Sequence, residues 1–429
     1  MHQVDLLNLL MRRRGRALRA WLTGICSFAR RSRVGQSAVG MLLALSVVAS
    51  AVGPVARTAA ATPAAPIDPS LQQQMAASPT QLLPVIVEMQ RSSLPTAGAN
   101  VQLAQQALNL LQLNGTAQVA LPLIDSAAGL ATAAGINAIS ATPGVAYIHP
   151  DAAVRAHSGS SLASGLGTAY PRAVNADRAW GTGRTGKGVT VAVLDSGIAL
   201  DADLTQPTSR ILAAVNFADP LGASPDPGGH GTHVAGTIAG NGTRSDGQYV
   251  GIAPGASLVD VRVLDGNGNG TTSSVVLGIQ WALAHRVQYN IRVLNLSLGA
   301  PTPGSYRLDP LAAAVEIAWA RGLVVVAAAG NTGGAVASPG ADPYVLTVGA
   351  TDDRGTAAVA DDVVGWFSSW GTPTGSTPKP DVVAPGRRIV SLRVPGSTLD
   401  RLLPDHVVTA SNGASYFRLT GTSMATAVV

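Results

Sequence analysis

The sequence predicts an α/β fold, in which helices cover both faces of a doubly wound and mostly parallel sheet, with a smaller α+β domain before it. Beyond residue 169, short apolar runs rich in β-branched residues alternate with helical stretches, which is the pattern of a buried parallel sheet. Each run ends on a polar or glycine-rich element, and ligands bind at the carboxyl ends of strands in such sheets. The length of 429 residues also suits two folded units.

The first 61 residues predict an export signal and a linker. Eight arginines between positions 12 and 33 precede the apolar run 38–53, in which Ala49-Ser50-Ala51 suits signal cleavage. The run holds about 15 apolar residues, short of the roughly 20 that span a bilayer, so we expect bacterial-type secretion without a stable membrane anchor after processing. The only cysteine, Cys26, lies in this segment, which excludes cysteine catalysis and disulfides in the processed chain.

The basic charge of the chain does not indicate a nucleic-acid partner. The net charge is +5, but nine of the 29 basic residues and one of the 24 acidic residues lie in the first 60 positions. The remaining 20 basic and 23 acidic residues make a slightly acidic chain without a basic patch. We therefore exclude nucleic-acid binding.

Residues 62–156 predict a small α+β domain with a ferredoxin-like sheet. Strands and helices alternate in a β-α-β-α-β order that packs helices on one face of a sheet. The predicted elements are a strand at 84–89, a helix at 100–115, an extended segment at 116–124, a helix at 133–140 and a strand at 144–150. The Gly/Ser-rich stretch 157–168 follows as a linker suited to cleavage.

Residues 169–429 supply the parallel sheet. The predicted strands and helices are the apolar runs 188–195, 257–265, 291–299 and 323–331 and the helical stretches 273–286 and 309–322.

Two side chains at the ends of predicted elements are suited to acid–base chemistry. Asp195 ends the first strand and His230 lies between glycines at the start of a helix. A capping role for Asp195 and a metal site formed by His230 and His233 are the alternatives, but the HxxH spacing lacks the glutamate of a zinc protease motif, and His233 suits a structural role.

Ser423 and Asn331 occupy two further strand endings. Ser423 follows the strand 414–419 where a helix begins, so its hydroxyl suits either a helix cap or a nucleophile beside backbone N–H groups. Asn331 suits either a turn or a donor to a developing oxyanion. Asp, His and Ser in this chain order match one of the three known triad orders, whereas Gly421-Thr-Ser423-Met-Ala425 is not the G-x-S-x-G of an α/β-hydrolase.

Five segments resemble the signature segments of the subtilisin-like serine proteases, in family order over residues 170–429. They are VAVLDSGI, GHGTHVAGTIAG, NLSLG, VVVAAAGN and GTSMA. The resemblance implies an endopeptidase in which Asp195 orients His230, His230 is the general base for Ser423, and Asn331 with the Ser423 amide binds the oxyanion. It implies polypeptide substrates, which pair with an edge strand at Gly268-Asn269-Gly270 and enter a pocket with two walls, Ser297-Leu298-Gly299 and Ala328-Ala329-Gly330.

The resemblance extends more loosely to residues 62–156, which look like the inhibitory propeptide of this family. It implies an intramolecular inhibitor that is removed by autocleavage within 155–170. No cofactor is required for the chemistry. Structural calcium is common in the family, and Asp203 or the loop 241–248 is a candidate contributor.

The chain departs from the family pattern after the serine. Ala427 replaces the usual proline, and the sequence stops at Val429, so we expect a truncated chain in which the helix after Ser423 is incomplete. The alternative functions are an inactive subtilase-fold fragment or binding module, and a lipase or esterase with a similar triad. The segment 387–417 is longer than in compact relatives and has no predicted role.

Overall fold

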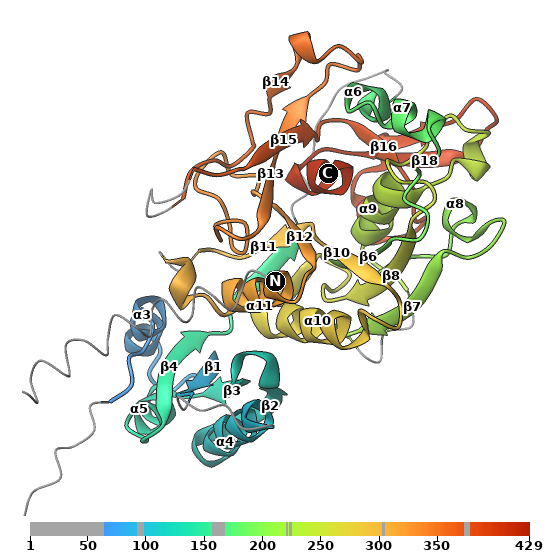
Figure 1. The fold of residues 1–429 in the computed structure, drawn as a ribbon. Helices are drawn as coiled ribbons and strands as arrows, with labels where there is room; N and C mark the ends of the chain where they lie inside the picture. Colours follow the sequence, from blue (N-terminus) through green and yellow to red (C-terminus); the bar gives the residue numbers. More distant parts are fainter. Residues whose placement is uncertain are drawn as a thin grey trace, which may run out of the picture. The chain divides into compact units, whose positions relative to one another are not determined.

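The computed structural model describes residues 64–91, 98–156, 168–219, 222, 225–302, 305–372 and 378–429. The predicted export signal and nearly all of the predicted processing linker lie outside these residues. Residues Thr62–Val429 form one compact unit, which Figure 1 shows as a ribbon. Within the described ranges, no helix is both long and apolar enough to cross a bilayer.

The region 64–156 contains a four-stranded antiparallel sheet with its own apolar core. The strand order is β2-β3-β1-β4. The elements in chain order are α3 (Pro69–Ala77), β1 (Leu83–Met89), α4 (Ala99–Asn114), β2 (Gly115–Leu121), β3 (Ser126–Ala131), α5 (Ala133–Ser140) and β4 (Val145–Pro150). The predicted order was incomplete, because α3 and β3 were missed. The β3 sequence SAAGLA has no β-branched residue, so its strand conformation comes from pairing with β1 and β2.

The main sheet of the second region confirms the predicted α/β class. Its strand order is β14-β13-β12-β10-β6-β8-β7, with β15 beside β13, and only the short β14 runs antiparallel to its neighbour. The strands are β6 (Thr190–Asp195), β7 (Ile211–Asn216), β8 (Ser257–Arg262), β10 (Ile291–Leu296), β12 (Val324–Ala328), β13 (Leu346–Asp352), β14 (Val363–Val364) and β15 (Val382–Pro385). Four of these, β6, β8, β10 and β12, match the predicted apolar runs.

Helices pack on both faces of this sheet. Figure 1 shows α10 (Thr272–His285) and α11 (Pro310–Ala320) on one side, with α9 (His230–Ala239) and the carboxy-terminal helix α13 (Thr422–Val428) on the other. The strand β6 shows why both faces are apolar. Ala192 and Leu194 join the core that contains α10 and α11, whereas Val191 and Val193 join the core that contains α9 and α13. The sequence of a strand that is buried on both faces is therefore a continuous run of apolar residues.

Two small sheets complete the structure near the carboxyl ends of the main strands. One contains β5 (Ala153–Ala156) between β9 (Asn269–Thr271) and β11 (Leu298–Gly299). The other contains β16 (Ile389–Ser391), β17 (Val407–Thr409) and β18 (Ser415–Leu419), and the short helix α12 (Thr398–Leu402) lies in its β16–β17 connection. The segment 387–417, which had no predicted role, thus forms a folded layer. The remaining short helices are α6 (Tyr170–Ala173), α7 (Ala176–Gly181) and α8 (Ala202–Thr205).

His233 joins α9 to this second small sheet. Its Nε2 lies 3.2 Å from the carbonyl oxygen of Ile389 and 3.0 Å from that of Phe417, so the ring donates to the backbone of β16 and β18. Burial lowers the pKa of His233 to about 3, which keeps the imidazole neutral. This is the structural role that the sequence predicts for His233.

We expect His233 to make the fold less stable on acidification. The unfolded chain binds a proton at His233 below about pH 6.5, whereas the folded chain does not until about pH 3. The stability present above pH 6.5 is therefore lost as the pH falls, by up to about 1.4 kcal/mol per unit. Urea unfolding of the chain and of His233→Asn at pH 7 to 4 measures this contribution. A variant with the same pH dependence as the parent contradicts it.

Candidate active site

Asp195 ends the central strand β6 in a turn that only glycine permits. Gly197 has a φ of +116°, and a Cβ there would lie 1.8 Å from the carbonyl oxygen of Pro225. The tight turn leaves the side chain of Asp195 fully buried at the carboxyl edge of the sheet. Its Oδ1 accepts a hydrogen bond from the amide of Ser196, 2.7 Å away.

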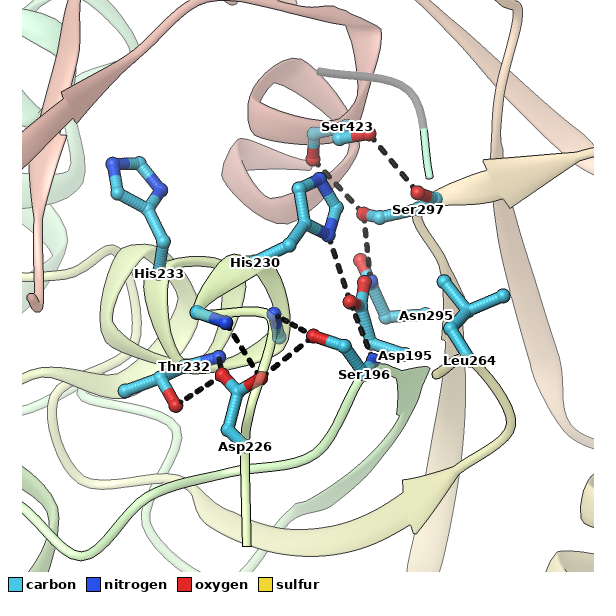
Figure 2. Close-up of polar contacts among 12 residues, drawn as sticks. Asp195, Ser196, Asp226, His230, Thr232, His233, Leu264, Asn295, Ser297 and Ser423 are labelled. Atoms are coloured by element: carbon cyan, nitrogen blue, oxygen red, sulfur yellow. Dashed lines mark hydrogen bonds and ion pairs between the residues drawn. The ribbon is translucent and has the colours of Figure 1, made fainter. Parts of the chain in front are cut away.

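Asp195 and His230 form a buried hydrogen-bonded pair. The distance from Asp195 Oδ1 to His230 Nδ1 is 2.7 Å, and the two residues are 0% and 2% exposed. Figure 2 shows the ring of His230 lying between Asp195 and Ser423. Among the described residues, His230 Nε2 has no hydrogen-bond partner. With its Nδ1 proton held by Asp195, this nitrogen can act as a base.

The pKa of His230 reflects opposing contributions. Desolvation, the largest single effect, lowers the pKa, while the charge of Asp195, its hydrogen bond and the charge of Asp226 raise it. The raising effects prevail, so the pKa of His230 lies above its usual value of 6.5. The imidazolium is therefore stabilised by fixed negative groups in a site from which water is excluded.

Asp226 is a second buried acid of the site, which the sequence pattern does not predict. Its Oδ1 accepts from the Ser196 hydroxyl and the Gly229 amide, both at 2.8 Å. Its Oδ2 accepts from the amide and hydroxyl of Thr232, at 2.8 and 2.6 Å. The pKa of Asp226 lies above its usual value, because the effect of burial exceeds the lowering by these four donors. Each of the four contacts is a hydrogen-bond donor, which is the environment that a carboxylate needs when it is buried. Figure 2 shows Asp226 joining the turn after Asp195 to the first turn of α9.

Ser423 is the second residue of α13, which is separated from the end of β18 by two residues. Its Oγ donates to the carbonyl oxygen of Ser297 at 3.0 Å, and its own carbonyl accepts from the Ser297 hydroxyl at 2.9 Å. The Ser297 hydroxyl also accepts a hydrogen bond from Asn295 Nδ2, at 2.9 Å. The buried end of β10 therefore fixes the backbone of Ser423. The sequence pattern does not predict this role of Asn295.

Thr422 orients the amide of Asn331. Asn331 Oδ1 accepts from the amide and hydroxyl of Thr422, at 2.9 and 3.0 Å, and the Gly330 amide donates to the same hydroxyl at 3.1 Å. Asn331 Nδ2 is buried and has no partner among the described residues. An oriented, unpaired N–H donor beside Ser423 is suited to bind an oxyanion. Thr422 directly precedes Ser423 and binds Asn331, which are both predicted site residues. Nothing in the sequence distinguishes it from an ordinary loop threonine.

The residues predicted to bind an extended peptide flank β5. In this antiparallel sheet, Val154 pairs with Gly270, Arg155 pairs with Asn269 and Gly299, and Ala156 pairs with Leu298. The Ala156 amide also donates to the carbonyl oxygen of Gly268 at 3.0 Å. The strand β5 thus lies between the predicted edge strand and one predicted pocket wall. The other predicted wall, Ala328-Ala329-Gly330, is buried at the carboxyl end of β12.

The region suggested for calcium is held together by an arginine. The amide of Arg244 donates to Asp203 Oδ1 at 2.6 Å, its guanidinium pairs with Asp201 and donates to the carbonyl oxygen of Ser415, and Tyr416 donates to Asp203 Oδ2 at 2.7 Å. Within the described part of the chain, no group of three or more His, Cys, Asp or Glu side chains is placed to hold a metal. Calcium stays a prediction without an assigned site.

Comparisons with known proteins point to one family. Residues 186–429 match the sequence profile of the Subtilase family. The chain is 44% identical over 259 residues to serine protease AprX of Bacillus subtilis (strain 168), a match that covers 57% of this chain and 55% of AprX. It is 36% identical over 292 residues to an alkaline protease of Alkalihalobacillus alcalophilus, covering 68% of this chain and 63% of that protein.

A third relative is matched over more of its length. The chain is 38% identical over 254 residues to subtilisin Savinase of Lederbergia lenta, covering 59% of this chain and 77% of the relative. In contrast, the matched part of this chain spans little more than half of AprX.

We predict that Asp226→Asn lowers the pKa of His230, because the substitution removes one of the negative charges that stabilise the imidazolium. The other titratable groups around this centre are Asp195 on β6, Asp260 on β8 and His233 on α9. An NMR titration of the ¹⁵N-histidine-labelled chain measures the change, with the signal assigned by its loss in His230→Gln. The exposed Asp177→Asn, which makes the same change in net charge, is the control. An equal pKa in both variants contradicts the prediction.

Proposed function

The chain belongs to the subtilase family, and from that membership we propose that it is a serine endopeptidase, made as a secreted proenzyme that processes itself. The observation that carries the proposal is the buried Asp195–His230 pair, with the unpartnered Nε2 of His230, at the helix terminus that carries Ser423. These observations support the roles of nucleophile for Ser423, base for His230 and orienting residue for Asp195.

In the proposed mechanism His230 Nε2 removes the proton of the Ser423 hydroxyl as the oxygen attacks the scissile carbonyl. The hydroxyl turns from the Ser297 carbonyl toward His230 when substrate binds, a small torsional change of one side chain. Asp195 stabilises the imidazolium that forms. His230 then protonates the leaving amine, and water hydrolyses the acyl-enzyme by the same proton transfers in reverse order.

The tetrahedral oxyanion is bound by Asn331 Nδ2 and the Ser423 amide. Asn331 Nδ2 has no other partner among the described residues, and Thr422 fixes the opposite end of the same amide. The donor is therefore preorganised and needs no rearrangement at the moment of reaction. Losing one such donor costs about 10²–10³ in kcat, a range established on subtilisin.

Substrates are extended polypeptides that add a strand between β9 and β11. The supporting observation is that the chain's own β5 pairs in this way with both strands. Main-chain hydrogen bonds supply affinity in this mode of binding. The walls of the pocket for the residue before the cut are small and uncharged, so the preference there is apolar or broad.

The region 62–156 is proposed to be the inhibitory propeptide. Two observations support this. Its last strand, β5, pairs with β9 and β11, between which substrates are proposed to bind. The Asp151 carboxylate also accepts from the amide and hydroxyl of Ser273, at 2.9 and 2.6 Å, at the start of α10. Autocleavage follows within 155–170, and export depends on the predicted signal in residues 1–61. The polypeptide substrates and the propeptide are the only partners proposed.

We predict that the purified chain 62–429 loses its first hundred or so residues with time, and that Ser423→Ala does not. Asn331→Ala is processed about 10²–10³ times more slowly, because one oxyanion donor is lost. Intact-mass spectrometry over time measures this, with Ser411→Ala, an exposed serine, as the control that processes normally. If neither the parent nor the control is processed, the chain is not a self-processing protease, and the inactive fragment or binding module is the better description.

A further inference from the structure

The connection between β16 and β17 lies against the helix that carries His230. The Ser391 hydroxyl donates to the carbonyl oxygen of His233 at 2.8 Å. Leu392 packs so closely on α9 that a Cβ at Gly236 would lie 2.5 Å from its Cγ. From these contacts the chain continues toward the start of α9, where α12 lies.

The first turn of α12 contacts the loop directly before His230. The amide of Thr398 donates to the carbonyl oxygen of Pro227 at 2.9 Å, and the amide of Leu399 donates to that of Gly228 at 3.1 Å. First-turn amides of a helix have no acceptor within the helix, so these two bonds satisfy donors that need a partner. At Gly229, whose φ is +87°, a Cβ would lie 2.5 Å from Ser397 Oγ. His230 is the next residue.

Asp400 gives this turn its shape. Its Oδ1 accepts from Arg393 Nε at 2.6 Å, and its Oδ2 accepts from the Gly396 amide at 2.8 Å. Its amide donates to the Ser397 hydroxyl at 3.3 Å, which caps the helix. The hydrogen bond from Arg393 is the main reason that the pKa of Asp400 lies below its usual value. Leu399 and Leu403 pack on the core that contains α9 and α13, so the turn is attached to the interior.

The loop 226–229 is therefore held from two sides. From the interior, the Asp226 carboxylate accepts from the Gly229 amide and from Thr232. From the opposite side, the α12 amides donate to the carbonyl oxygens of Pro227 and Gly228. The contacts with Asp226 use backbone N–H groups of the loop and of α9, whereas the contacts with α12 use backbone C=O groups of the loop. Neither set of contacts can therefore replace the other. Together they fix the backbone from which the His230 ring projects.

We propose that residues 393–403 are a positioning element for His230, with Asp400 as the residue that keeps the first turn of α12 on the loop 227–229. The element does not touch the reacting atoms. It acts by holding the backbone before His230 so that the ring keeps its hydrogen bond to Asp195. Its effect on turnover rests on the proposed protease function, whereas its effect on the His230–Asp195 geometry does not.

The geometric test uses the full chain carrying Ser423→Ala, labelled with ¹⁵N-histidine. The His230 Nδ1–H bonded to Asp195 is observed as a low-field proton resonance, assigned by its loss in His230→Gln. Asp400→Ala is expected to broaden or remove this resonance, and Asp400→Asn, which keeps an acceptor for the Gly396 amide, to retain part of it. Leu402→Ala is the matched control, because Leu402 is on the same helix and 69% exposed. Its resonance is expected to equal that of the parent.

The kinetic test uses the same substitutions in the chain with Ser423 intact. Asp400→Ala is expected to lower kcat for a peptide substrate about 10- to 100-fold with KM unchanged, since a small misplacement of a catalytic group has effects of this size. Labelling of Ser423 by phenylmethanesulfonyl fluoride, which needs the base but no peptide groove, is expected to slow in parallel. For Asp400→Asn, both kcat and the labelling rate are expected to lie between those of Asp400→Ala and those of the parent. For Leu402→Ala, both are expected to equal those of the parent.

Two results overturn the proposal. One is an Asp400→Ala resonance identical to that of the parent in a folded chain, as judged by circular dichroism. The other is a rise in KM with kcat intact, which marks the element as a wall that contacts substrate. If the chain with Ser423 intact neither cleaves peptide nor reacts with the sulfonyl fluoride, the protease function fails, and the resonance alone decides the positioning role.

Discussion

The hydrogen bond between Asp195 and His230 is the interaction on which the rest of the site depends. Both side chains are buried, and burial alone disfavours the charged form of each. The pair is stable only if the backbones of β6 and α9 approach closely enough for a short, direct contact. That requirement explains the glycine turn after Asp195 and the left-handed glycine before His230.

The sheet and the loops contribute differently to this geometry. Parallel strands end along one edge, so the fold alone brings Asp195, Asn331 and the start of α13 into one neighbourhood. Final orientation comes from polar side chains in the connections. Thr422 fixes the amide of Asn331, Ser297 holds the Ser423 backbone, and Asp226 joins the turn after Asp195 to α9. Each is buried and fully used in hydrogen bonds, which adds rigidity at low dielectric.

The sequence was sufficient to predict the fold class and the residues at strand endings, because continuous apolar runs such as 188–195 and 323–331 are legible without tertiary information. It was insufficient for β3, whose small residues are extended only because two neighbours pair with them. The role of Asp226 is not predicted for a similar reason. The sequence PDPGGH at 225–230 is typical of an ordinary turn, and only the fold brings the hydroxyls of Ser196 and Thr232 to the Asp226 carboxylate. The role of 387–417 depended wholly on contacts with α9 that are distant in sequence.

The strand β5 has a kinetic consequence, because it belongs to the same chain as β9 and β11. Its pairing is a first-order event that does not depend on protein concentration, and a short tether gives an effective local concentration in the millimolar range. If substrates bind between β9 and β11 as proposed, a free peptide at micromolar concentration competes poorly with such a strand. If the chain is cut after β5, as proposed, rebinding of β5 becomes a second-order event. Dilution, which has no effect on the joined chain, then becomes enough to separate β5 from β9 and β11.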